Sequence, residues 1–204
     1  MMKSILVATF AFLLLGGLLG CASTPVMVPT ETVKETPAPQ SPHVEKTSDQ
    51  AMLKAGLTDR QLPASEVADL SDRLLANDNS LNDQETMARL ELLILKTMKG
   101  SDKTNRATLW RNLGIIHYHQ HKYKQARQEL QAANELNPKS ARTHFYLACL
   151  FAHQGKIYEK LGKKRVSRQQ FKRAAIEIEQ ARKLEPNNSL YKKSAREIIQ
   201  QENI

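Results

Sequence analysis

The sequence predicts an all-α fold of antiparallel helical hairpins that ends in a capping helix. Apolar residues recur at spacings of three and four from residue 64 onward, which is the period of an amphipathic helix. The same region has no convincing alternation of apolar and polar residues, so no strand is expected. Gly100, Pro138 and Pro186 are helix-stopping residues, and they divide the region into helical pairs.

Residues 1–20 are predicted to be a secretory signal peptide. Lys3 supplies a positive charge, and an apolar stretch of 15 residues runs from Ile5 to Leu19. A membrane-spanning helix needs about 20 apolar residues, so this stretch is short for one. A cleaved signal is therefore expected.

The signal ends in a motif that resembles the lipobox of bacterial lipoproteins. The motif is Leu18, Leu19, Gly20 and Cys21, and Leu19 is larger than the family's usual residue. The resemblance implies cleavage after Gly20 and a lipid on the Cys21 thiol. By similarity to Gram-negative lipoprotein sorting, Ala22 in place of Asp implies an outer-membrane anchor that faces the periplasm. The alternative is an ordinary signal, or a membrane anchor, with a chance cysteine.

Residues 21–60 are predicted to be the lipidated cysteine and a flexible tether. Five of the eight prolines lie between residues 22 and 48, separated by Thr, Ser, Glu and Lys. Such a composition cannot bury enough apolar surface to fold. Residues 49–60 are ambiguous, and the tether is expected to hold the folded part away from the membrane.

Residues 61–104 are predicted to form a helical hairpin. Ser65 opens the first helical pattern, which ends near Asn77. Asn82 or Asp83 can cap the second helix, and Gly100 stops it. Whether the hairpin is a degenerate repeat of the following region stays open.

Residues 105–204 contain a more specific pattern. Its members are Trp110, Leu113, Gly114, Tyr123, Ala126, Leu130, Ala133, Leu136 and Pro138. The pattern resembles the tetratricopeptide repeat, counted from Ala107 to Ser140. Gly114 and Ala126 are small enough for two helices to approach closely, and Pro138 ends the second helix because it lacks a backbone donor.

A second unit follows with an altered length. Its first helix matches the pattern when counted from Ala141, but its second matches only when counted from Gly155. The two proline stops are 48 residues apart, which exceeds the 34-residue period by 14. A repeat with lengthened helices that turns near Gly162 to Ser167 is predicted, and two overlapping repeats are the alternative. Ser189 is expected to cap a final helix.

In tetratricopeptide repeats the first helix of each repeat lines a concave groove. The resemblance therefore implies a groove lined by Arg111, Ile115, Tyr118, His119, Arg142, Phe145, Cys149 and His153. Basic and aromatic side chains suit an extended peptide with acidic groups. The alternative is a short groove that the early hairpin covers.

Charge is concentrated in the carboxyl-terminal half. Residues 101–204 have a formal charge of +12, whereas residues 61–100 have −3. The densest run is Lys160, Lys163, Lys164, Arg165, Arg168, Lys172 and Arg173. Anionic lipid headgroups, lipopolysaccharide or an acidic protein face could bind there, and a solvated helix face is the alternative. Nucleic acid is not expected outside the cytoplasm.

The sequence shows no catalytic constellation. It has no Gly-rich phosphate loop, nucleophile elbow or Cys-x-x-Cys pair, so neither an enzyme nor a cofactor is predicted. His117, His119 and His121 alternate, but on a helix only the outer two share a face, and no metal site is expected. We expect His117 to pack between the helices and His119 to line the groove.

These features together predict a membrane-anchored adaptor or scaffold that docks another envelope protein. Lipoproteins with similar repeats assist the assembly of pili, secretins or other envelope machines, so the resemblance implies such a role. The alternative is a lipoprotein that binds an anionic envelope polymer or lipid through its basic helix.

Overall fold

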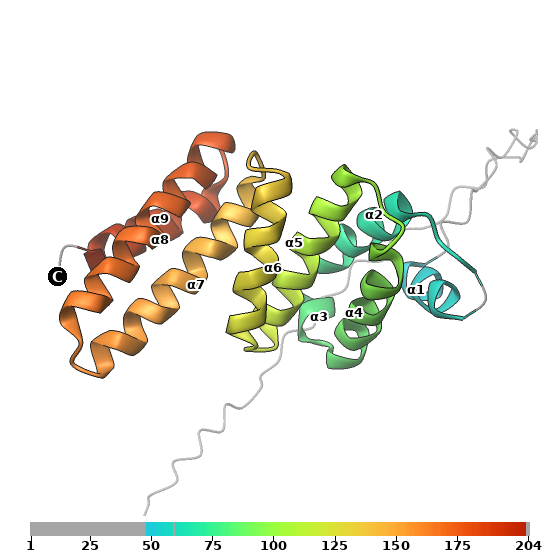
Figure 1. Cartoon of the computed structure of the whole chain (residues 1–204), viewed down its shortest axis with the longest axis horizontal. Helices are drawn as coiled ribbons and strands as arrows, with labels where there is room; N and C mark the ends of the chain where they lie inside the picture. The colour runs from blue at the N-terminus through green and yellow to red at the C-terminus, as the bar shows by residue number, and fades with distance from the viewer. Residues whose placement is uncertain (1–47, 59, 203–204) are drawn as a thin grey trace, which may run out of the picture. The chain divides into compact units, whose positions relative to one another are not determined.

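The computed structural model describes residues 48–58 and 60–202. Within these ranges it contains helices and no strand, which confirms the all-α prediction (Figure 1). The helices are α1 Asp49–Leu57, α2 Ala64–Leu75, α3 Asp78–Asn82, α4 Gln84–Met98, α5 Lys103–His119, α6 Tyr123–Leu136, α7 Ala141–Lys160, α8 Lys164–Leu184 and α9 Ser189–Glu202. The predicted signal, lipobox and proline-rich segment, Cys21 included, lie outside the described residues.

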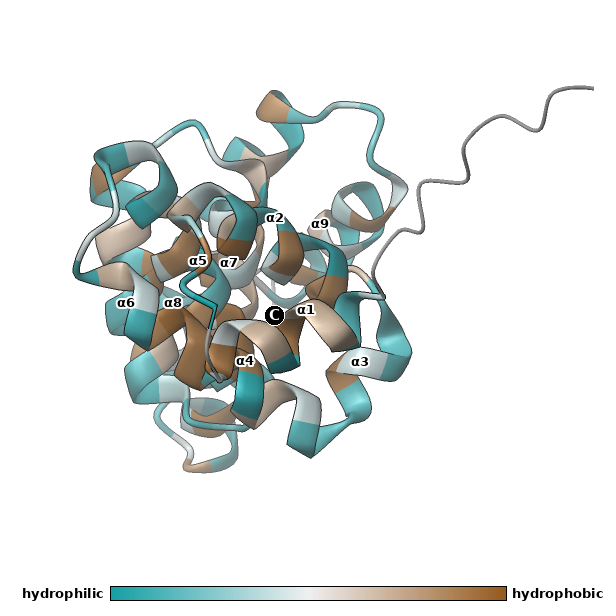
Figure 2. Cartoon of the chain, turned by 90° about the vertical axis from the view of Figure 1, so that its right-hand side faces the viewer, coloured by the Kyte–Doolittle hydropathy of each residue, from teal (hydrophilic) through white to brown (hydrophobic). Residues whose placement is uncertain are grey.

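The described residues all belong to one compact unit. Its apolar core runs through the whole helix array, from Leu53 in α1 to Ile198 in α9. Figure 2 shows hydrophobic residues gathered toward the middle of the array and hydrophilic residues along its outside. None of the described helices is long and apolar enough to cross a membrane.

Helix α1 corrects the predicted extent of the tether, which was placed as far as residue 60. Ser48 caps the helix by accepting a hydrogen bond from the Ala51 backbone N–H at 3.2 Å. Leu53 is fully buried, and α1 packs against α4. Asp49 also accepts from Arg73 of α2 at 2.8 Å. Residues 49–57 therefore belong to the folded part.

The segment between α2 and α4 contains a short helix that the sequence did not predict. Helix α2 ends at Leu75, before the expected Asn77, and α3 occupies Asp78–Asn82. Asp83 caps α4 through the Glu85 backbone N–H at 3.1 Å. Helix α2 packs against α5 as well as α4, so it continues the helix array next to the following pair.

Helices α5 and α6 approach closely at Gly114. A Cβ atom built on Gly114 would lie 2.7 Å from Leu130 Cγ and 3.2 Å from the Ala126 carbonyl oxygen. Neither contact leaves room for a side chain. Leu130 and Ala126 are themselves fully buried, so this crossing forms the centre of the pair.

Helix α7 is continuous over 20 residues and helix α8 over 21. The residues by which this unit exceeds the 34-residue repeat therefore lengthen both helices. They approach at Gly155, where an added Cβ would lie 3.0 Å from the Phe171 ring. Ser167 Oγ donates to the Gly155 carbonyl at 2.9 Å. The chain turns at Gly162, whose φ of +71° suits glycine.

Helix α9 is capped differently from the prediction. Asn188, rather than Ser189, caps it, because Asn188 Oδ1 accepts from the backbone N–H groups of Leu190 at 3.1 Å and Tyr191 at 3.4 Å. Buried apolar residues attach α9 to α8, and Tyr191 stacks on Phe145 of α7 with ring centroids 5.0 Å apart.

Candidate functional site

Two of the predicted groove residues are core residues. Ile115 is fully buried, and Phe145 is buried beneath Tyr191. The prediction that their side chains line an open groove is wrong, because neighbouring helices cover them. Cover by the early hairpin was the stated alternative, but cover of Phe145 by Tyr191 of α9 was not predicted.

The two predicted groove arginines are engaged within the protein. Arg111 donates to Asp72 Oδ2 at 2.7 Å, and Arg142 lies 3.4 Å from Asp72 Oδ1. Arg142 also donates to the Leu75 carbonyl at 2.7 Å. Asn112 Nδ2 donates to the same carboxylate at 2.9 Å. These contacts fix α5 and α7 to α2, so α2 occupies the part of the concave face that the arginines were expected to offer to a partner.

Three of the four remaining groove residues line an open pocket of about 490 Å³, and His119 does not. Helices α5, α7, α8 and α9 all contribute to its walls. The lining residues are Tyr118, Cys149, Ala152, His153, Lys156, Phe171, Ser194, Glu197, Ile198, Gln200 and Gln201. Tyr118, Cys149 and His153 were predicted. The α9 residues were missed, since the repeat pattern places no groove residues on a capping helix.

One side of the pocket continues into an aromatic cluster. The ring of Tyr118 lies 5.8 Å from Tyr123 and 5.4 Å from Tyr146, centroid to centroid, in edge-to-face arrangements. His119 Nε2 and the Tyr146 hydroxyl lie within hydrogen-bond distance at 3.3 Å. Tyr123 packs on the His153 ring at 4.1 Å. Edge-to-face pairs of this kind hold aromatic side chains in defined positions.

Four titratable groups of this region, Tyr118, His119, Cys149 and His153, favour their neutral forms. Burial raises the pKa of the Cys149 thiol to about 12 and also raises the pKa of Tyr118. Burial, together with neighbouring cations, lowers the pKa of His119 and His153. The thiol is therefore protonated and a poor nucleophile at neutral pH. This chemistry suits the binding of an apolar or aromatic side chain.

The three alternating histidines do not converge. His117 is buried between carboxylates, His119 lies against Tyr146, and His121 has a φ of 60° in the turn before α6. His121 Nδ1 lies 2.8 Å from the Tyr123 hydroxyl. Among residues 48–58 and 60–202, no group of three or more His, Cys, Asp or Glu side chains could hold a metal ion.

His117 connects three helices through two carboxylates. Its Nδ1 lies 2.6 Å from Glu129 of α6 and its Nε2 lies 3.2 Å from Glu91 of α4. Burial lowers the pKa of His117, but the hydrogen bonds and charges of Glu129 and Glu91 outweigh it and raise the pKa above 6.5. His144 has a raised pKa as well, through its hydrogen bond to Glu177 at 2.7 Å.

These histidines predict a pH-dependent stability. Because the pKa values of His117 and His144 are raised on folding, their contribution is complete below pH 6.5 and is lost as the pH rises through the folded pKa values. The contribution of His117 and His144 to the free energy of unfolding should therefore fall from mildly acidic to mildly alkaline pH, whereas that of His119 and His153, whose pKa values are lowered, changes in the opposite direction. Urea unfolding at a series of pH values measures this. His117→Gln should remove its part of this fall and make the slope of unfolding free energy against pH less negative; an unchanged slope in His117→Gln would contradict this origin.

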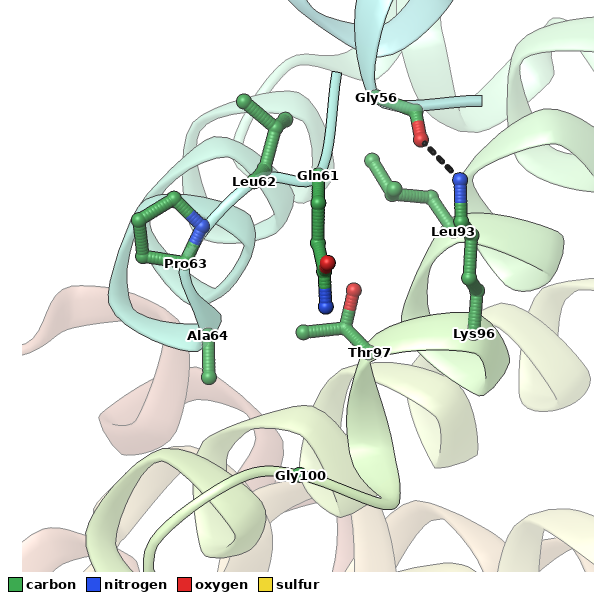
Figure 3. A pocket seen from close by; sticks show the side chains of 9 residues that line it. All are labelled: Gly56, Gln61, Leu62, Pro63, Ala64, Leu93, Lys96, Thr97 and Gly100. Atoms are coloured by element: carbon green, nitrogen blue, oxygen red, sulfur yellow. Dashed lines mark hydrogen bonds between the residues drawn. The ribbon is translucent and has the colours of Figure 1, made fainter. Parts of the chain in front are cut away.

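A second pocket, of about 400 Å³, lies between the segment before α2 and the end of α4 (Figure 3). Lys96 is its sole titratable lining residue, and its Nζ already donates to the Gly56 carbonyl at 3.0 Å. Figure 3 shows Gln61 and Thr97 facing each other across the opening. This set offers hydrogen bonds but no acid, base or nucleophile.

The predicted basic run lies on the surface. Lys160, Lys163, Lys164, Arg165, Arg168, Lys172 and Arg173 are all exposed. They belong to the end of α7, the turn and the first half of α8. They are therefore separate from the α5–α7–α9 pocket, although Lys156 of the pocket rim lies one helical turn before Lys160.

Comparison with known proteins identifies the central pair of helices. Residues 107–140 match the family model described as tetratricopeptide repeat. The chain therefore contains a tetratricopeptide repeat. The match covers α5 from Ala107, α6, and the turn up to Ser140. No curated protein matches the chain. Tetratricopeptide repeats are protein-interaction modules, so the repeat indicates a protein partner for this chain.

Proposed function

We propose that this protein is an adaptor that captures a segment of another envelope protein in the pocket between α5, α7 and α9. The observation that supports this best is the pocket itself, which is open to solvent and is lined by aromatic, aliphatic and polar side chains from four helices. A binding site of this kind buries an anchoring side chain of the partner.

The lining favours a particular kind of partner segment. Tyr118, Phe171 and Ile198 can cover an apolar or aromatic side chain, and Lys156 stands at the rim to face an acidic group. Arg111 and Arg142 are already engaged within the protein, because both pair with Asp72. The expected ligand is an extended or helical segment with one large apolar residue beside an acidic one.

The adaptor is proposed to be anchored to the outer membrane through lipid on Cys21. This part rests on the lipobox-like motif, which lies outside the described residues. An anchored adaptor would position its partner at the periplasmic face of the membrane, and help in assembling a pilus, a secretin or a comparable complex is the narrower role we propose. The absence of recognisable catalytic motifs in the sequence is in line with such a scaffold.

Site-specific photo-crosslinking in living cells tests the adaptor role. A photoreactive residue at Lys156 or Glu197, both exposed and on the pocket rim, should give one discrete crosslinked partner. The controls are Lys124 and Gln128, which are exposed on α6 and do not line the pocket. Equal products from rim and control positions, or none from the rim, would contradict the proposal.

A further inference from the structure

The end of the α7–α8 hairpin combines exposed aliphatic side chains with dense positive charge. We propose that this tip, residues 157–168, is a membrane-binding element that inserts Ile157 and Leu161 among the headgroups of an anionic lipid bilayer. The proposal does not depend on the pocket having a protein partner. It concerns a different surface and a different class of ligand.

The tip begins where the two helices stop covering each other. Ser167 Oγ of α8 donates to the Gly155 carbonyl of α7 at 2.9 Å, where the two helices are still packed together. Beyond that point residues 159–165 are all exposed. Figure 1 shows the connection at the free end of the α7–α8 pair. Because both helices are lengthened relative to the 34-residue repeat, the tip extends further than the end of an ordinary repeat would.

Two aliphatic side chains occupy this exposed end. Ile157 is 44% exposed and Leu161 is 61% exposed. Ile157 lies on α7, and Leu161 is the residue directly after its end. The two are four residues apart and therefore lie next to each other on one face. The exposed apolar surface of this pair is unfavourable in water, and binding to an apolar environment would bury it.

Cations surround this apolar pair. Residues 156–173 contain eight Lys or Arg residues and one acidic residue, Glu159, which gives a formal charge of +7. Within the part of the chain that the structure describes, none of the eight forms a salt bridge. Their charge is therefore available to an external anion.

The arrangement favours a lipid surface over a folded acidic partner. Lys160, Lys163 and Lys164 come from α7, the turn and α8, so cations border Leu161 from both helices. Residues 159–165 are all exposed around a turn, and a fluid bilayer adapts to such an end, whereas a specific protein side chain would need a shaped cavity. Lysine stems can lie along acyl chains while the ammonium groups reach phosphate. Each cation at an anionic surface strengthens binding roughly fivefold.

Vesicle binding by residues 45–204, which form a compact unit with its own core, tests the proposal. We expect binding to phosphatidylcholine vesicles that contain phosphatidylglycerol and none to pure phosphatidylcholine. Ile157→Ser with Leu161→Ser should weaken binding about tenfold. Reversal of Lys163, Lys164 and Arg165 to Glu should abolish it. Thermal unfolding checks that each variant is folded.

A matched charge reversal supplies the control. Lys183→Glu, Lys192→Glu and Lys193→Glu change the same amount of charge, and Lys183 lies about 28 Å along α8 from Lys164. This control should bind almost as the parent does. Equal loss in both triple variants would reduce the effect to net charge and overturn the proposal.

A reporter at the tip distinguishes insertion from surface attraction. Leu161→Trp should show blue-shifted emission, and quenching by brominated lipid, on addition of the anionic vesicles. An unshifted emission would overturn the proposal. So would tip variants that lose the partner crosslinked from Lys156 while vesicle binding stays unchanged, because the tip would then belong to the protein partner.

Discussion

Replacing Leu130 with Ala is expected to lower the free energy of unfolding by about 2–5 kcal/mol. Leu130 is fully buried at the α5–α6 crossing, so truncation removes apolar contacts and leaves a cavity. Chemical denaturation of residues 45–204 measures the change. Leu190→Ala is the matched control, because Leu190 is 51% exposed and its truncation should cost under about 1 kcal/mol.

A substitution at Gly114 tests the same close contact from the other helix. Gly114→Ala would place a Cβ 2.7 Å from Leu130 Cγ, and such overpacking costs about 1–3 kcal/mol, of which the gain in helix propensity offsets about 1 kcal/mol. In the Leu130→Ala background the two Leu130 contacts are gone and only the 3.2 Å contact with the Ala126 carbonyl oxygen remains, so the same substitution should cost less than it does in the parent. Strictly additive effects would show that the two residues do not share one close contact.

Replacing Cys21 with Ser is expected to move the protein entirely from the membrane fraction to the soluble fraction. Cells grown with labelled palmitate should label the parent and not Cys21→Ser, because the proposed acyl chains require this thiol. Cys149→Ser is the control and should stay labelled, since Cys149 lies within the folded unit with a pKa raised to about 12. An unlabelled parent protein would contradict the lipid anchor.

The tetratricopeptide repeat could be predicted because its determinants are local. Gly114, Ala126 and Pro138 stand at fixed spacings, and each acts on the backbone within its own pair of helices. The lengthened pair follows from the same logic, since Gly155 and Phe171 repeat the close approach of Gly114 and Leu130. The apolar period alone is enough to predict these helices.

Other features depend on contacts that no local pattern contains. Arg111 and Arg142 lie on the predicted face, but both donate hydrogen bonds to Asp72. Asp72 is 39 residues from Arg111 and 70 residues from Arg142 in the sequence. Helix α1 is short and weakly patterned, and its burial depends on α4. The α9 wall of the pocket follows from how α9 packs on α8. The exposed state of Ile157 and Leu161 likewise follows from where the helices end.

The recognition role of the pocket is best decided by one affinity measurement. The protein crosslinked from Lys156 is titrated, in purified form, against the parent and against Ser194→Trp, which fills the pocket from α9. We expect the affinity to fall at least about tenfold, because the anchoring side chain loses its place. Gln128→Trp on α6 should bind as the parent does. An unchanged affinity for a folded Ser194→Trp would contradict recognition in this pocket.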